Sequence, residues 1–304
     1  MDNAYHIPVL LAEAVAYLNI KPEGIYVDCT FGGGGHSRAI LERLGKTGRL
    51  VAFDQDEDAQ KNVPDDSRIL FIPHNFRHLK RFLQLHGISG VDGVLADLGV
   101  SSHQFNEGSR GFSTRFEAKL DMRMDQRQDR TAFDVLQTFP EAGLHKLFEQ
   151  YGEVTNAKTL ARTIVMARAA TPLKTIDDLK TAVYDVVKGN PAKYFAQVFQ
   201  ALRIEVNDEL GALKALLEQL PQVLKPSGRA VVITFHSLED RLVKVFFKKG
   251  TFEEEVENPF EMTTVQNPLK VITKKPVEPG AEELKQNSRA RSAKLRVAER
   301  VAGV

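Results

Sequence analysis

Three groups of residues in the first hundred positions have the types and spacing of a ligand site. Four consecutive glycines, residues 32–35, follow an apolar run that ends at Asp28, and His36 comes next. A backbone that bare either forms a tight turn or lets a ligand lie against the chain. Two further apolar runs end at Asp54 and Asp97. Strand-end carboxylates beside a glycine turn are typical of a site for a nucleotide-like ligand.

The position of Asp54 indicates what the ligand carries. It lies twenty residues after Gly34, where an acid commonly takes the two hydroxyls of a ribose. A carboxylate can accept both hydroxyl protons at once, which an amide cannot. The competing interpretation is that Asp54 or Asp56 caps a following helical turn. Together, turn and acid indicate an adenosine-containing ligand without distinguishing a dinucleotide from S-adenosylmethionine.

Asp97 discriminates best among these ligands. At the end of a fourth strand it is expected across the crevice from the glycine turn, and polar side chains follow at Ser101, Ser102 and Gln104. The alternative is a turn or capping role for Asp97. Convergence of several polar groups at one sheet edge favours a binding site.

The elements that position these residues follow from the apolar pattern. Strands alternating with helices predict βαβ units and an α/β, Rossmann-like parallel sheet, with strands at 24–31, 48–54, 67–76 and 91–100 and helices at 36–45 and 77–87. Helical periodicity then predicts an inserted all-helical domain, opened by an exposed charged loop at 109–130. We expect the core in 1–105 and 208–304 and the insertion in 106–207.

The α/β pattern resumes after the insertion. A helix at 208–224, a strand at 227–237 and a helix at 238–250 are followed by an acidic loop at 252–261. Two last strands, 270–277 and 292–301, are predicted to be antiparallel neighbours at the sheet edge. Turn residues and then basic ones separate them.

Composition bounds the class of protein. The 304 residues are 42% hydrophobic and 27% charged with a net charge of +1, so the chain is globular and no global field demands a nucleic acid. The single cysteine, Cys29, excludes an intrachain disulfide and fits a reducing compartment. No run of about 18 apolar residues and no signal-peptide pattern occurs, so we expect a cytoplasmic protein without membrane contact.

Motifs along nearly the whole chain resemble the bacterial 16S ribosomal RNA cytosine-N4 methyltransferases. The matching runs, in family order, are YHIPVLLAEAV, VDCTFGGGGHSRAIL, VDGVLADLGVSSHQF, RGFS, LDMRMD, LRIEVNDEL, ITFHSLEDRLVK and NSRARSAKLRVAER. The resemblance implies a seven-stranded class I methyltransferase core with the inserted domain recognising substrate. It implies S-adenosyl-L-methionine as cofactor and a cytidine in the decoding region as target. The implied partner is 16S ribosomal RNA in the small subunit, and the sequence also allows a homodimer.

The resemblance assigns residues one by one. Those matching cofactor positions are Gly33, Gly34, Gly35, His36, Asp54, Phe76, Asp97 and Gln104. Phe76 matches a position flanking the cofactor base, although a core aromatic opening a helix explains it equally well. His36 is ambiguous too, because it could cap the following helix. The D/N/S-P-P-Y/F/W motif of many amino-group methyltransferases is replaced here by DLGVSS, so their mechanism cannot be copied.

The exocyclic amine of cytosine is a poor nucleophile, and we expect a site that accepts its hydrogen bonds and aligns it. Asp97 and His236 are the catalytic candidates, and no metal is expected. Candidate substrate contacts are Ser101, Ser102, Ser237, Glu239 and Arg241. A capping Ser237 and a surface pair of Asp240 with Arg241 are the alternative there. Cations for the RNA backbone are predicted at Arg110, Arg115, Arg123, Arg127, Arg289, Arg291, Lys294 and Arg296.

Two rival classes share parts of this pattern. A nicotinamide-dependent oxidoreductase would have the same glycine turn and ribose acid. A non-catalytic RNA-binding or ribosome-assembly factor would have the same cations. Cofactor binding and RNA methylation distinguish them.

Overall fold

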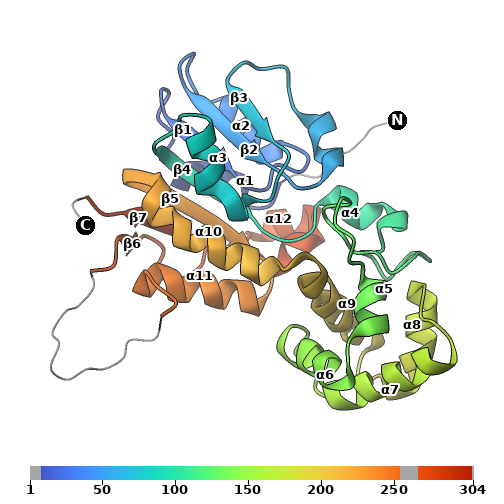
Figure 1. The fold of residues 1–304 in the computed structure, drawn as a ribbon. Helices are drawn as coiled ribbons and strands as arrows, with labels where there is room; N and C mark the ends of the chain where they lie inside the picture. Colours follow the sequence, from blue (N-terminus) through green and yellow to red (C-terminus); the bar gives the residue numbers. More distant parts are fainter. Residues whose placement is uncertain (1–7, 254–265, 303–304) are drawn as a thin grey trace, which may run out of the picture. The chain divides into compact units, whose positions relative to one another are not determined.

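A seven-stranded sheet forms the centre of the α/β part of the protein (Figure 1). The computed structural model describes residues 8–253 and 266–302. The strand order is β3-β2-β1-β4-β5-β7-β6, in which the first five are parallel and β7 is antiparallel to both neighbours. The strands are β1 (Ile25–Asp28), β2 (Arg49–Phe53), β3 (Ile69–Ile72), β4 (Val91–Asp97), β5 (Leu224–Thr234), β6 (Leu269–Val271) and β7 (Lys294–Arg300).

The register brings the predicted site residues to one edge of the sheet. Asp28 at the end of β1 is paired with Ala52 of β2 and Leu95 of β4, and Asp97 at the end of β4 is paired with Ile233 of β5. Because these strands are parallel, their carboxyl ends meet at one edge. The predicted parallel sheet and the antiparallel last strands are confirmed.

Helices cover both faces of the sheet, as a doubly wound fold requires. Apolar side chains of α1 (Leu11–Leu18) and α2 (Gly35–Leu41) pack into a core on one face. Those of α3 (Leu79–Leu85), α10 (Glu209–Val223) and α11 (Ser237–Lys249) pack into the core on the other face (Figure 1). Strands buried on both faces read as continuous apolar runs, which is why the sequence located them.

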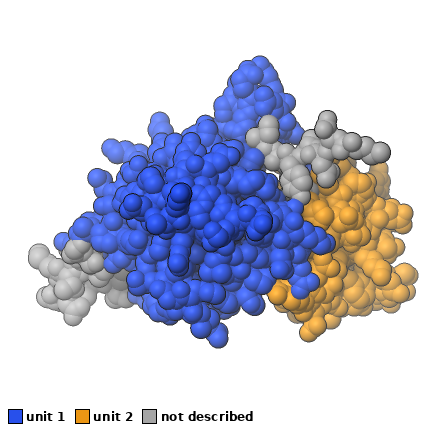
Figure 2. Space-filling model, turned by 90° about the horizontal axis from the view of Figure 1, so that it is seen from above, with its two compact units in different colours: residues 1–99, 211–304 blue, residues 100–210 orange. Residues whose placement is uncertain are grey.

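The chain divides into two compact units (Figure 2). Unit 1 comprises residues 1–99 and 211–304 and holds the sheet, and unit 2 comprises residues 100–210, which include the predicted insertion. Unit 2 has its own apolar core. Its α-helices are α4 (Ser102–Asn106), α5 (Ala132–Thr138), α6 (Glu141–Gln150), α7 (Ala157–Ala170), α8 (Ile176–Val183) and α9 (Pro191–Asn207). In the described part of the chain, no helix has both the length and the apolar character needed to cross a bilayer.

Short helices complete the two units. In unit 1 these are α12 (Ala281–Gln286) and three 3-10 helices, η1 (Glu57–Asn62), η2 (Phe76–His78) and η5 (Ser288–Ser292). In unit 2 the 3-10 helices are η3 (Gly108–Arg110) and η4 (Tyr184–Val186). The sequence pattern predicted no helix at α12 or α4.

Several sequence predictions need correction. The prediction that 109–130 is an exposed loop is wrong, because Phe112, Leu120, Met122 and Met124 are buried in the unit 2 core. Strand β5 begins at Leu224, earlier than predicted, directly where α10 ends. The strand predicted at 270–277 is only three residues long. Most of the predicted acidic loop at 252–261 lies outside the described residues.

Candidate functional site

The glycine turn joins β1 to α2 at the carboxyl edge of the sheet. Gly32 and Gly34 have φ angles of +49° and +74°, which side-chain-bearing residues rarely adopt. A Cβ on Gly34 would lie 2.8 Å from the Phe31 ring, and one on Gly35 would lie 2.1 Å from Cγ of Pro8. Packing of the loop against the protein itself already requires glycine at both positions.

Asp28 is the buried centre of this turn. One carboxylate oxygen accepts a 2.7 Å hydrogen bond from the Ser37 hydroxyl, and the other accepts one from the Thr30 backbone N–H at 3.1 Å. Burial raises the pKa of Asp28, opposed by the charge of His36 and by these hydrogen bonds. The sequence pattern did not single out Ser37 or Thr30. The signal was available, because both lie two residues from the glycine run and carry hydroxyls.

His36 is buried and does not cap α2. The N-cap is Gly34, and no side chain caps that helix. The Nε2 atom of His36 lies 3.1 Å from the Val9 carbonyl oxygen, which can only accept, so Nε2 carries a proton. Burial lowers the His36 pKa although the charge of Asp28 opposes this. The Nδ1 atom of His36 lies 3.7 Å from Oδ2 of Asp97.

Asp97 is half-buried and has one unsatisfied oxygen. Its Oδ1 atom is inaccessible and has no hydrogen-bond partner among the described residues. Its backbone N–H donates to the Thr30 hydroxyl at 2.7 Å, which fixes the end of β4 to the glycine turn. Burial raises the pKa of Asp97 well above its usual range, and the charges of Asp28, Glu239 and Glu283 raise it further. A buried polar atom without a partner is costly, so the site is suited to a ligand that donates there.

Asp54 follows β2 and is held by two backbone donors. Its Oδ2 accepts from the Gly32 N–H at 2.7 Å and its Oδ1 from the Asp56 N–H at 2.9 Å. Burial, opposed by these hydrogen bonds, raises the pKa of Asp54 to about 7. Asp56 is the residue that caps η1, by accepting from the Asp58 N–H. The capping alternative thus applies to Asp56 and leaves Asp54 for another role.

Phe76 opens η2 after β3 and is half-buried against the core on the α3 face. Asn75 caps η2, and its amide donates to the Gln55 side chain at 2.8 Å, which ties this turn to the loop that follows Asp54. Both predicted roles, a core aromatic and a wall beside the cofactor base, fit this position.

His236 and Glu239 cap α11 reciprocally. The Nδ1 atom of His236 accepts from the Glu239 N–H at 3.5 Å, while a Glu239 oxygen accepts from the Phe235 N–H at 2.8 Å. The His236 Nε2 atom lies 3.2 Å from the other Glu239 oxygen. The N-cap is therefore His236, and the capping role considered for Ser237 is wrong. Ser237 and Arg241 are exposed, whereas Glu239 is buried.

In unit 2, Ser101 and Gln104 form a capping box at the start of α4. The Ser101 hydroxyl accepts from the Gln104 N–H and the Gln104 side chain accepts from the Ser101 N–H, both at 3.1 Å. Ser102 is the first residue of this helix. A cofactor contact by Gln104 and substrate contacts by the two serines stay predictions.

Most of the predicted phosphate-binding arginines of unit 2 bind groups within residues 110–127 of their own segment. Arg110 is buried and donates to the carbonyls of Arg123 and Met124. The prediction that Arg110 is a surface cation for the RNA backbone is therefore wrong. Arg123 pairs with Asp121 at 2.8 Å, and Arg127 pairs with Asp125 at 2.8 Å. Arg115 is exposed and lies over the Phe105 ring at 5.8 Å.

The cations near the C-terminus divide in the same way. Arg296 is buried and holds Asp240 through two hydrogen bonds of 2.7 and 3.1 Å. The alternative pairing of Asp240 with Arg241 and the prediction of Arg296 as a surface cation are therefore both wrong. Lys294 lies 3.9 Å from the same carboxylate. Arg291 is exposed, and Arg289 is half-buried.

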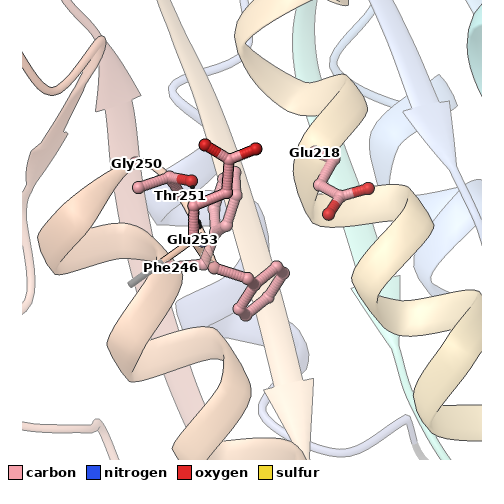
Figure 3. A pocket seen from close by; sticks show the side chains of 6 residues that line it. Glu218, Phe246, Gly250, Thr251 and Glu253 are labelled. Atoms are coloured by element: carbon pink, nitrogen blue, oxygen red, sulfur yellow. Dashed lines mark hydrogen bonds between the residues drawn. The ribbon is translucent and has the colours of Figure 1, made fainter. Parts of the chain in front are cut away.

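A hollow lies elsewhere on unit 1, between α10 and α11 (Figure 3). Its lining consists of Glu218, Phe246, Gly250, Thr251, Phe252 and Glu253. None of these residues lies at the carboxyl ends of β1, β2 or β4. The strand-end acids therefore remain the candidate site.

Comparison with known proteins shows the family to which the chain belongs. A sequence model described as the MraW methylase family matches residues 3–301. Proteins named "Ribosomal RNA small subunit methyltransferase H" are similar over nearly the full length. The one from Flavobacterium johnsoniae is 55% identical over 298 residues, 98% of each chain. The one from Parabacteroides distasonis is 51% identical over 302 residues, 99% of each chain. A solved structure, a putative rRNA-methylase from Clostridium thermocellum, is 12% identical with a TM-score of 0.46 and covers 97% of this chain and 100% of that one.

Proposed function

Because the chain belongs to the MraW methylase family, we propose that it methylates the exocyclic N4 of a cytidine in the decoding region of 16S ribosomal RNA. S-adenosyl-L-methionine is the methyl donor in this proposal. The relatives' shared name, a small-subunit ribosomal RNA methyltransferase, supports the RNA substrate. The N4 position and the decoding region rest on the resemblance of the sequence motifs. The small subunit as substrate implies that the protein works in the cytoplasm.

The observation that carries the proposal is the cluster of strand-end acids around the glycine turn. Asp28, Asp54 and Asp97 end adjacent strands of one parallel sheet, where ligands of such folds bind. The unsatisfied Asp97 Oδ1 calls for a donor, and Asp54 can accept from the two ribose hydroxyls. A ligand with hydroxyl and ammonium donors therefore fits the residues present.

The cofactor would be held by the chain's own groups. Asp54 would accept from the ribose, the backbone of Gly33–Gly35 would line the amino-acid end, and Phe76 would flank the base. When bound, S-adenosylmethionine supplies an electrophilic methyl group on a positively charged sulfur. His36 is buried against the Val9 carbonyl and would hold the glycine turn in place. Asp97 would then be the carboxyl that contacts the reacting groups.

The remaining work is to orient the cytosine amine. A base stacked in RNA cannot reach the sheet edge, so the target must leave its stack. Asp97 is the residue best suited to accept a hydrogen bond from the amine, which favours a more tetrahedral and more nucleophilic nitrogen. His236, at the carboxyl end of β5, is the second candidate to bind the base or take the proton. We propose that unit 2 recognises the substrate RNA around this cytidine.

The direct test is mass analysis of ribosomal RNA after small subunits lacking the modification are incubated with protein and labelled S-adenosylmethionine. We expect one N4-methylcytidine in the decoding region. Cofactor bound without any methylcytidine would refute the enzymatic proposal and indicate a binding or assembly factor. Thermal protection by nicotinamide cofactors, and none by S-adenosylmethionine, would instead indicate an oxidoreductase.

A further inference from the structure

We propose that the exposed face of η2 and α3 binds the phosphate backbone of the RNA substrate. This cationic face consists of His74, Arg77, His78, Lys80 and Arg81. The inference rests on the proposed function, because it deepens the RNA contact of the same protein. It adds a surface that none of the sequence motifs or relatives' names assigns.

The first observation is the distribution of charge. No Asp or Glu occurs between Asp66 and Asp92, whereas the chain as a whole has 40 acidic residues beside 41 basic ones. The cationic face lies within this acid-free stretch. Burial lowers the pKa of His78, and the nearby basic side chains of Arg77, Arg81 and His74 lower it further. A local concentration of positive charge this close in space attracts a polyanion.

The second observation is that two cations of this face, Lys80 and Arg81, and the imidazole of His78 are available to a ligand. His78 and Arg81 are exposed, and their side chains make no hydrogen bond or ion pair with the described residues. Among the described residues, the Lys80 ammonium donates to a neutral partner, the Gln222 side chain, at 2.7 Å. Arg110, Arg123 and Arg127 contrast with them, because they are buried or paired inside unit 2.

The third observation is that the face is held rigidly. Leu79 and Leu83 of α3 are fully buried, which directs the intervening cations outward. Gln219 of α10 accepts from the Lys80 N–H at 2.8 Å and donates to the Arg77 carbonyl at 2.9 Å. Figure 1 shows α3 and α10 side by side on this face of the sheet. Preorganised cations bind with less entropic cost than cations on mobile loops.

The fourth observation is the position and the apolar surface beside the charges. Helix η2 follows β3 at the carboxyl edge, and Asn75 ties it to the Asp54 loop. The exposed His74 ring stacks on Phe82 with centroids 4.7 Å apart, and Leu85 is 67% exposed. Rings and apolar groups between cations are typical of surfaces that contact unpaired nucleotides. An RNA strand running from this face would reach the edge that holds the candidate site.

The test compares two double variants that each remove two positive charges from an exposed helix. K80Q/R81Q changes the cationic face, and K248Q/K249Q changes the end of α11 in the same unit. A fluorescein-labelled single-stranded RNA of about 20 nucleotides containing the decoding-region cytidine is titrated by anisotropy at several salt concentrations. Removing one phosphate-binding cation lowers the salt slope by about 0.7 for single strands, so K80Q/R81Q should lower it by about 1.4. If non-electrostatic interactions are unchanged, binding at 0.1 M salt becomes about 25-fold weaker.

K248Q/K249Q should keep the wild-type slope, and R81Q alone should lower it by about 0.7. Thermal unfolding of all variants checks the fold. An unchanged slope in K80Q/R81Q, or equal losses in both double variants, overturns the inference. The inference is also overturned if K80Q/R81Q binds the RNA as well as the wild type but no longer binds whole subunits. That result would indicate an acidic protein surface as the partner of this face. This readout does not need methyl transfer, so an inactive wild-type protein would refute the proposed reaction without touching this inference.

Discussion

Raising the pH from 6 to 8 should tighten binding of S-adenosylhomocysteine, and Asp54 should cause most of the change. Burial raises the pKa of this carboxyl to about 7, although the Gly32 and Asp56 N–H groups favour its charged form. Both oxygens already accept one backbone proton. Only the carboxylate can accept two ribose hydroxyls as well, because a protonated oxygen must donate. The form that binds best is therefore the ionised one, which predominates above pH 7.

The size of the effect follows from the pKa. With a pKa of about 7, roughly one tenth of Asp54 is ionised at pH 6 and roughly nine tenths at pH 8. If only the carboxylate binds, Kd should be roughly tenfold lower at pH 8 than at pH 6. Burial also raises the pKa of Asp97, so any pH dependence that remains without Asp54 is attributed to that carboxyl.

Isothermal titration calorimetry at pH 6, 7 and 8 measures the effect. Asp54→Asn should weaken binding at pH 8 by about 10- to 100-fold, the cost of losing charged hydrogen bonds, and should flatten the profile to the part due to Asp97. Asp56→Asn is the matched control, because it changes a buried acid in the same loop and asparagine also caps helices well. It should keep a pH-dependent Kd of similar size, with the midpoint moved to lower pH because the charge of Asp56 contributes to the raised pKa of Asp54. A wild-type Kd independent of pH, or a profile lost in Asp56→Asn and kept in Asp54→Asn, would refute the reasoning.

Three further predictions test the site and the fold. Asp97→Ala should lower kcat for N4-methylcytidine formation by about two orders of magnitude or more at saturating cofactor, and wild-type turnover would remove Asp97 from the mechanism. Arg296→Gln leaves the Asp240 carboxylate without its buried partner and should lower the free energy of unfolding by about 3–5 kcal/mol in denaturant titrations. The exposed Arg291→Gln should change it by less than about 0.5 kcal/mol, and equal effects would contradict the burial argument. Gly35→Ala places a Cβ 2.1 Å from the Pro8 ring and should lower the free energy of unfolding by about 1–3 kcal/mol in the same denaturant titrations. Gly280→Ala, which has open space at its Cβ, should lower the free energy of unfolding by less.

Strand-end chemistry was predictable from the sequence because two signals coincide there. An apolar run buried on both faces marks a strand, and the first acid after it marks the edge at which parallel strands end. Asp28, Asp54 and Asp97 satisfied both conditions, and the register places them accordingly. The same pattern did not reveal where α10 ends and β5 begins, because Val223 and Leu224 are both apolar and no turn residue separates them.

The cations could not be sorted from the sequence, because charge type says nothing about partners. Arg110 and Arg296 look like surface residues among other basic ones, and both are buried by contacts with residues that the chain pattern does not bring together. Segment 109–130 was misread for a related reason. Its apolar residues are spaced irregularly among charges, so neither helical nor strand periodicity reveals that they enter the unit 2 core.

The strand-end acids also bear on what the site prefers to bind. Asp28 raises the pKa of Asp54 and of Asp97, and Asp56 adds to the effect on Asp54, so part of the cost of ionising these groups is mutual repulsion. A ligand that brings positive charge and N–H or O–H donors would relieve that repulsion and satisfy the Asp97 oxygen at once. An anionic ligand such as the pyrophosphate of a dinucleotide would increase it. The electrostatics of this edge therefore favour a cationic cofactor over a nicotinamide dinucleotide, a distinction that the glycine turn and the ribose acid do not make.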